Sequence, residues 1–144
     1  MRKCGLLLSG AQPAWNGEEV NSEDDGILLG EEIADVKLKD NELVVLSACE
    51  TGLGKLSAEG VLGLQRAYKK AGAGCVLMSL WKVSDMATTI LMNSFYENLF
   101  SGCSKHDAIR NAQRFVREYK DENGNRPFES PYYWAAWILL DALN

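Results

Sequence analysis

The sequence predicts a single α/β domain in which helices cross between the strands of a sheet. Residues 43–46 and 75–78 are continuous apolar runs, which are typical of strands buried on both faces. The segments that follow these runs have apolar residues at helical spacing instead. With 144 residues, of which 47% are apolar, the chain is long enough to bury one hydrophobic core. Residues 1–144 are therefore expected to form one domain.

The N-terminal part predicts two short extended segments. Residues 4–10 read as a strand, and residues 12–25 read as an exposed polar loop. Residues 27–29 are a second short segment, leading into a helical turn at 30–33. This order allows the two extended segments to pair as a hairpin.

The C-terminal part predicts three helices and a last strand. The first helix follows the glycines at 52 and 54 and stops at Gly72, with two lysines in its last turn. Ser84 and Ser104 are expected to cap the next two helices, because serine side chains accept hydrogen bonds from free amides at a helix start. The apolar faces expected for the three helices are Val61, Leu64, Tyr68 and Ala71; Ile90, Leu91, Phe95 and Leu99; and Ile109, Ala112, Val116 and Tyr119. A loop at 121–127 then leads to a final apolar strand at 134–140, whose Trp134 and Trp137 are expected to face opposite sides.

Composition excludes several classes of function. The formal net charge is −5, and no stripe of Lys and Arg stands out, which argues against nucleic acid as a partner. No apolar run reaches the roughly 18 residues of a membrane span, and the N-terminus lacks the layout of a signal peptide, so a cytoplasmic protein without membrane contact is expected. Four cysteines without a CxxC pair and one histidine make a poor ligand set, so neither a metal nor a cofactor is expected, and the cysteines should be free thiols.

Cys49 is the cysteine in the most unusual surroundings. It follows the strand at 43–46, and the carboxyl ends of strands in open α/β sheets are where binding and catalysis gather. Gly52 and Gly54 let backbone approach a ligand closely and leave amide donors that favour a thiolate and can hold an oxyanion. These residues leave two interpretations open, a nucleophile and a merely buried cysteine.

Four sequence blocks resemble the CHAT domain, a family of caspase-like cysteine peptidases often attached to tetratricopeptide (TPR) repeats. The blocks occur in the family's order through most of the chain: LSACETGLG at 46–54, EGVLGLQRAY at 59–68, SLWKVSD at 79–85 and PYYWAAW at 131–137. The resemblance implies a caspase-like three-layer α/β/α sandwich and makes Cys49 the nucleophile. It also implies that the segment from Ser79 to Trp81 lines the substrate cleft and pairs with an extended peptide.

The family's general base is missing from these blocks. In CHAT domains it is a histidine in a His-Gly motif on the strand before the cysteine strand, and the glycine amide contributes to the oxyanion hole. This sequence has no His-Gly pair, so it resembles the C-terminal portion of the domain, incomplete at its N-terminal side. Its one histidine, His106, lies in the first turn of a predicted helix and is expected to be an exposed helix-start residue.

Several further residues carry two interpretations. Glu50 is either a solvated loop acid or a residue facing the substrate cleft. Asp85 either complements a helix N-terminus or recognises a basic substrate side chain. Trp81 is the stronger candidate for substrate binding, because it lies past the carboxyl end of a strand, whereas Trp134 and Trp137 are expected to pack. Cys4, Cys75 and Cys103 are taken as core or surface thiols.

The function predicted from the sequence is peptide-bond hydrolysis through Cys49, with a protein or peptide as substrate and TPR repeats in the parent protein. The chain alone is expected to be inactive because the His base is absent. The alternative is a non-catalytic interaction module with the same fold. A flavodoxin-like ligand binder is a weaker third interpretation, since no glycine-rich phosphate loop opens a helix directly after a strand. Because the strand at 43–46 lacks the neighbour that carries the histidine, it is expected either to form a homodimer through its edge or to be covered by residues 5–9.

Overall fold

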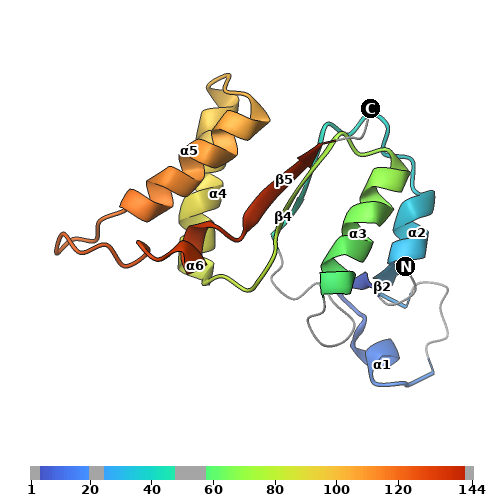
Figure 1. Cartoon of the computed structure of the whole chain (residues 1–144). Helices are drawn as coiled ribbons and strands as arrows, with labels where there is room; N and C mark the ends of the chain where they lie inside the picture. Colours follow the sequence, from blue (N-terminus) through green and yellow to red (C-terminus); the bar gives the residue numbers. More distant parts are fainter. Residues whose placement is uncertain (1–3, 20–24, 48–57, 142–144) are drawn as a thin grey trace. The chain divides into compact units, whose positions relative to one another are not determined.

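The computed structural model describes residues 4–19, 25–47 and 58–141, with side chains from residue 63 onward in the last range (Figure 1). Its elements follow in the order β1 (Gly5–Leu7), α1 (Gln12–Trp15), β2 (Ile27–Leu29), α2 (Gly30–Asp35), β3 (Leu43–Leu46), α3 (Ala58–Ala71), β4 (Cys75–Ser79), α4 (Asp85–Phe100), α5 (Lys105–Glu118), α6 (Pro131–Trp134) and β5 (Trp137–Asp141). Strands and helices alternate as far as α4, and α5 and α6 then follow before β5, so the predicted α/β class is confirmed.

The described residues group into two compact units. The first takes its residues from 1–44, 50–76 and 141–144, and the second takes them from 45–49 and 77–140. Strands β3, β4 and β5 each contribute residues to both units. The one-domain organisation and the three-layer sandwich remain predictions from the sequence and the family resemblance.

The first unit contains a two-stranded sheet and a helix pair. β1 pairs antiparallel with β2, with Gly5 opposite Leu29 and Leu7 opposite Ile27, so the predicted pairing of these segments is confirmed. Helices α2 and α3 pack against each other (Figure 1). Gly63 on α3 lies against the buried Cys4, where an added Cβ atom would be 2.6 Å from the Cys4 Sγ atom. A larger residue at 63 would force this contact apart.

The three-stranded sheet has the order β3-β4-β5 and is mixed. The amides of Gly74 and Cys75 donate to the carbonyls of Asn41 and Glu42, at 2.9 and 3.0 Å, so β3 and β4 start side by side and run parallel. At the other end of β4, the Leu80 amide donates to the Ala136 carbonyl at 2.9 Å, directly before β5. β5 therefore runs antiparallel to β4.

β3 lies at an edge of this sheet among the described residues. Its first three residues are half-buried and only Leu46 is buried, whereas the central strand β4 is buried from Val76 onward. The sequence expectation that 43–46 is buried on both faces is thus wrong for the first three residues. The N-terminal segment does not cover this edge, because β1 pairs with β2 in a separate sheet.

The second unit is built around the antiparallel helices α4 and α5, which lie side by side in Figure 1. Both predicted caps are confirmed: the Ser84 hydroxyl accepts from the Ala87 amide at 3.2 Å, and the Ser104 hydroxyl accepts from the Asp107 amide at 3.1 Å. The helices turn at Gly102, whose φ of +92° is favourable only for glycine. Buried residues of this unit include Leu91, Phe95, Ile109, Ala112 and Val116, all on the predicted faces.

Two segments differ from the sequence expectation. The predicted loop at 12–25 begins with the short helix α1, which Pro13 helps to start because its fixed φ suits the first helical turn. The predicted strand at 134–140 starts only at Trp137, since Pro131 and the Ser130 cap make a helix of residues 131–134. Trp134 and Trp137 therefore belong to different elements, and the expectation that they face opposite sides of one strand is wrong. Within the described ranges, no helix is both long and apolar enough to cross a membrane.

Candidate functional site

The candidate site is built at the carboxyl ends of β3 and β4. Because these neighbouring strands are parallel, their last residues, Leu46 and Ser79, lie toward the same edge of the sheet. Ser79 is buried at the end of β4. Cys49 follows Leu46 by three positions in the sequence, but Cys49 and Glu50 lie outside the described residues. The described part of the site is therefore the segment from Ser79 to Asp85, here called the β4–α4 loop.

The β4–α4 loop is held against residues 131–136, here called the α6 segment. The Trp81 indole Nε1 donates to the Tyr132 carbonyl at 2.9 Å, and the Tyr132 hydroxyl donates back to the Lys82 carbonyl at 2.7 Å. The hydrogen bond from the Leu80 amide to the Ala136 carbonyl lies beside these two contacts. Three hydrogen bonds thus fix a loop of a few residues, and the buried side chain of Val83 anchors it further.

Trp81 has a structural role in this arrangement. Its ring is half-buried, and its only hydrogen-bond donor is directed to the Tyr132 carbonyl. The remaining ring surface is available for apolar contact with a substrate, whereas a polar contact through Nε1 is already made. Trp81 therefore positions the loop whether or not it also touches substrate.

Asp85 is exposed and is the first residue of α4, directly after the Ser84 cap. A carboxylate in this position interacts favourably with the positive end of the helix dipole. Its exposure also leaves it able to meet a basic side chain, so the structure is compatible with both interpretations made from the sequence.

His106 lies on a different element from the described residues that the sequence predicts for the site. It is exposed in the first turn of α5, as expected for a helix-start residue. The structure thus gives His106 no place on a strand before Cys49, which is where the family resemblance puts the base.

The three described cysteines are free thiols in different surroundings. Cys4 is buried, with 2% of its surface exposed. The Cys75 thiol lies 3.1 Å from Asp141 Oδ1, and the Cys103 sulfur lies 3.9 Å from Asn98 Oδ1. Each is half-buried or more, so these thiols are less accessible than free cysteine.

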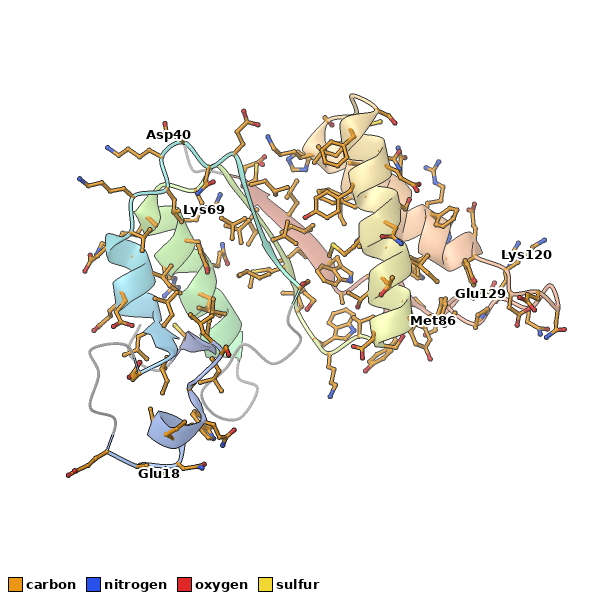
Figure 2. All side chains as sticks on the ribbon, turned by 180° about the vertical axis from the view of Figure 1, so that it is seen from behind. Glu18, Asp40, Lys69, Met86, Lys120 and Glu129 are labelled. Carbon is orange, nitrogen blue, oxygen red and sulfur yellow. The ribbon has the colours of Figure 1, made fainter. Side chains whose placement is uncertain are left out.

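Lys69, labelled in Figure 2 at the end of α3, forms a small polar cluster with Cys75 and Asp141. Its ammonium group donates to the Gly74 carbonyl at 3.0 Å. Burial lowers the pKa of Lys69, and the neighbouring Cys75 and Asp141 act in the opposite direction. The cluster ties the end of α3 to the start of β4 and stands among the structural contacts of the first unit.

Sequence reasoning missed Tyr132 as the partner of the β4–α4 loop. The loop and α6 lie some fifty positions apart in the chain, so no local pattern connects them. One signal was available: residues 79–85 and 131–137 were two of the four blocks that carried the family resemblance, and the structure shows that these two blocks bind each other.

Comparison with known proteins identifies the family to which the sequence is similar. The sequence model of the CHAT domain matches residues 2–141. Human Tetratricopeptide repeat protein 28 is 33% identical over 114 residues, and the mouse protein of the same name is 32% identical over the same length. These matches cover 79% of this chain but only 4% of each relative, so the chain spans a small part of the length of the curated relatives it matches. No solved structure gives a significant match.

Proposed function

The chain belongs to the CHAT domain family, and from this membership we propose that it is a caspase-like cysteine peptidase domain with Cys49 as its nucleophile. The proposed substrate is a protein or peptide, bound in extended form along the β4–α4 loop. Ser79 and Trp81 are the proposed lining residues, and Glu50 and Asp85 supply negative charge. The proposed location is the cytoplasm, and no cofactor or metal is needed.

The proposed chemistry is acyl transfer to sulfur. The Cys49 thiolate attacks the carbonyl carbon of a peptide bond, and the carbonyl electron pair moves onto the oxygen, which backbone amides stabilise. Collapse of this oxyanion breaks the C–N bond, and the departing amine takes up a proton from a general acid. Water then gives a proton back to that group and attacks the thioester, which releases the carboxylate product and regenerates the thiolate.

The observation that best supports this proposal is the fixed β4–α4 loop at the end of the strand beside β3. Three hydrogen bonds hold the loop to the α6 segment, and preorganised sites bind substrates at a lower entropic cost. The loop carries three of the proposed substrate-binding residues. A peptide lying along it would have its backbone near the end of β3, the strand that precedes Cys49 in the chain.

We further propose that these 144 residues are catalytically inactive on their own. The chain contains one histidine, and His106 lies on α5 rather than on a strand before Cys49. A general base contributes about 10²- to 10⁴-fold to such reactions, and an unactivated thiol with a pKa near 8.5 is only a few per cent thiolate at neutral pH.

The second candidate function is a non-catalytic interaction module. The position of His106 favours it, because a domain without a base retains only its binding surfaces. TPR repeats are the proposed partners within a longer protein, since the relatives are named as tetratricopeptide repeat proteins.

Turnover of a fluorogenic peptide library distinguishes the candidates. We expect no cleavage by the 144-residue chain, and cleavage when a strand bearing the family's His-Gly motif is supplied at its N-terminus. The gained activity should disappear on Cys49→Ala and persist on Cys103→Ser, the matched thiol control. Failure of the extended chain to cleave, although folded, would favour the interaction module.

A further inference from the structure

Helix α5 carries a face of arginines that is not apparent from the overall composition of the chain. Arg110, Arg114 and Arg117 are spaced by four and three residues, so they share one helix face and span roughly 10 Å along it. The net charge of −5 gave no sign of this face, and the sequence expectation that no basic stripe exists is wrong for α5.

The arginine face borders a groove with a volume of about 210 Å³. The groove is lined by Arg110, Gln113, Arg114, Arg117 and Trp134, so all its charged lining residues are cationic. Three guanidinium groups thus surround one groove in a protein that is acidic as a whole. Clustered guanidinium groups bind carboxylates and other oxyanions.

The floor of this groove is fixed by hydrogen bonds. The Gln113 amide donates to the carbonyls of Trp134 and Trp137, at 3.2 and 2.9 Å, and so ties α5 to the α6 segment. The Trp134 indole donates to the Glu129 carbonyl at 3.2 Å, which fixes the ring. The Arg117 guanidinium lies over that ring, 5.9 Å from its centroid. Stacking on an aromatic face orients a guanidinium while leaving its N–H edge free to donate.

The acidic residues around the groove leave much of its positive charge available. Arg110 pairs with Asp107 at 3.5 Å and Arg117 pairs with Glu118 at 2.9 Å, both between exposed side chains. Such exposed pairs are weak, so an incoming anion competes with them. Arg114 makes no ion pair or hydrogen bond with any other residue that the structure describes. Glu129, labelled in Figure 2, pairs with Arg126 at 3.7 Å, outside the groove lining.

We propose that this arginine groove binds an acidic segment of a partner protein, with Asp or Glu carboxylates accepting from Arg110, Arg114 and Arg117. Alternate side chains of an extended peptide on one face are about 7 Å apart, so two carboxylates fit the length of the arginine face. A long nucleic acid fits less well, because the rest of this acidic chain repels a polyanion. The proposal goes beyond peptide hydrolysis and does not depend on Cys49.

The groove and the candidate site each use a residue of the same short helix. Tyr132 on α6 holds the β4–α4 loop, and Trp134 on the same helix forms the groove. An acidic segment bound in the groove would therefore contact the same short helix that holds the loop.

Fluorescence anisotropy with two labelled eight-residue peptides tests the proposal. One peptide alternates Glu and Ser, and the other alternates Gln and Ser. We expect the acidic peptide to bind at low salt, and we expect its binding to weaken as added salt screens the charges. The neutral peptide should not bind. Arg114→Gln should raise the dissociation constant of the acidic peptide about three- to tenfold. This is the scale of one charge-assisted contact that is partly screened by solvent. Arg66→Gln, an exposed arginine on α3, is the matched control and should leave binding unchanged.

Three outcomes would overturn the proposal. The first is no binding of the acidic peptide to the folded chain at millimolar concentration. The second is an equal loss with Arg114→Gln and Arg66→Gln, which would indicate nonspecific attraction. The third is tighter binding of a single-stranded oligonucleotide of the same charge, which would assign the groove to phosphates. Circular dichroism of each variant establishes that it is folded.

Discussion

At the scale of single residues, hydrogen bonding and burial distinguish structural groups from chemically available ones. Trp81 and Tyr132 each direct a side-chain donor to a carbonyl of the other's segment, so their polar atoms serve the fold. Cys4 is buried against Gly63, and Cys75 contacts Asp141. Arg114 is different, because it lines a groove and has no ion-pair partner among the described residues.

Glu118 offers a test of the charge distribution beside the arginine groove. Its hydrogen bond with Arg117 is the main reason why the pKa of this carboxyl is lowered, and Arg117, Arg114 and Arg126 add favourable charge. We expect Arg117→Gln to raise the pKa of Glu118 toward its ordinary value, as followed by NMR titration of the side-chain carboxyl. Arg66→Gln is the control and should leave it unchanged.

The sign of the linked stability effect follows from that direction. Because the pKa of Glu118 is lower in the folded chain, the ionised carboxylate favours folding at neutral pH. This contribution is lost as the pH falls through the folded-state pKa, and it shrinks with added salt because the pair is exposed. An unchanged titration of Glu118 in Arg117→Gln would show that the pair does not persist in solution.

At the scale of elements, the sequence predicted what local patterns determine. Ser84 and Ser104 cap their helices as expected, and the apolar faces containing Phe95 and Val116 are buried. The final strand starts three residues later than the sequence predicts, because a run of apolar residues does not distinguish a short helix from a strand. Pro131 after Ser130 was the available signal for that helix.

Long-range contacts could not be predicted from local patterns. The pairing of the β4–α4 loop with α6, and the groove between α5 and Trp134, both join segments distant in the sequence. The mixed direction of the three-stranded sheet likewise depends on how β5 returns to β4. The resemblance to the CHAT domain supplied the candidate nucleophile, Cys49, which lies outside the described residues.

Tyr132→Phe tests the attachment of the β4–α4 loop. The substitution removes the hydroxyl that donates to the Lys82 carbonyl at 2.7 Å and preserves the ring. We expect a loss of about 0.5 to 1 kcal/mol in the free energy of unfolding, measured by urea denaturation, since the bond is exposed. Tyr96→Phe is the matched control on α4 and should change stability by less. Equal effects of the two variants would remove the structural role assigned to Tyr132.

Ser104→Ala tests the start of α5. The hydroxyl accepts from the Asp107 amide at 3.1 Å and donates to its carboxylate at 2.7 Å, so both contacts are lost. We expect a loss of about 1 kcal/mol in urea denaturation. Ser9→Ala, an exposed serine outside any helix, should be nearly neutral. A neutral Ser104→Ala would mean that α5 is held by packing alone.

At the scale of the whole chain, the edge strand β3 bears on whether the protein self-associates in solution. β3 has no partner on its outer side among the described residues, and β1 pairs with β2 instead of covering it. Leu43, Val44 and Val45 are half-buried and carry no charge. An edge of this kind is a template for another strand.

We therefore predict that the chain self-associates through β3. Multi-angle light scattering should give a mass above the 15.9 kDa of one chain, rising with concentration. Val44→Lys should shift the mass toward one chain, because a charge on an edge strand opposes pairing. A wild-type chain that stays at the mass of one copy throughout would contradict this prediction.

The central claim, that Cys49 is the nucleophile of this domain, is tested most directly by mapping iodoacetamide adducts on the native chain by mass spectrometry. The four thiols compete in one sample, so three of them serve as internal controls. Cys4 should react last because it is buried, and Cys75 and Cys103 should react slowly because each is half-buried and contacts a side-chain oxygen. We predict that Cys49 is modified first, since the sequence places Gly52 and Gly54 after it and their expected amide donors favour a thiolate. Modification of Cys103 or Cys4 before Cys49 would contradict the claim.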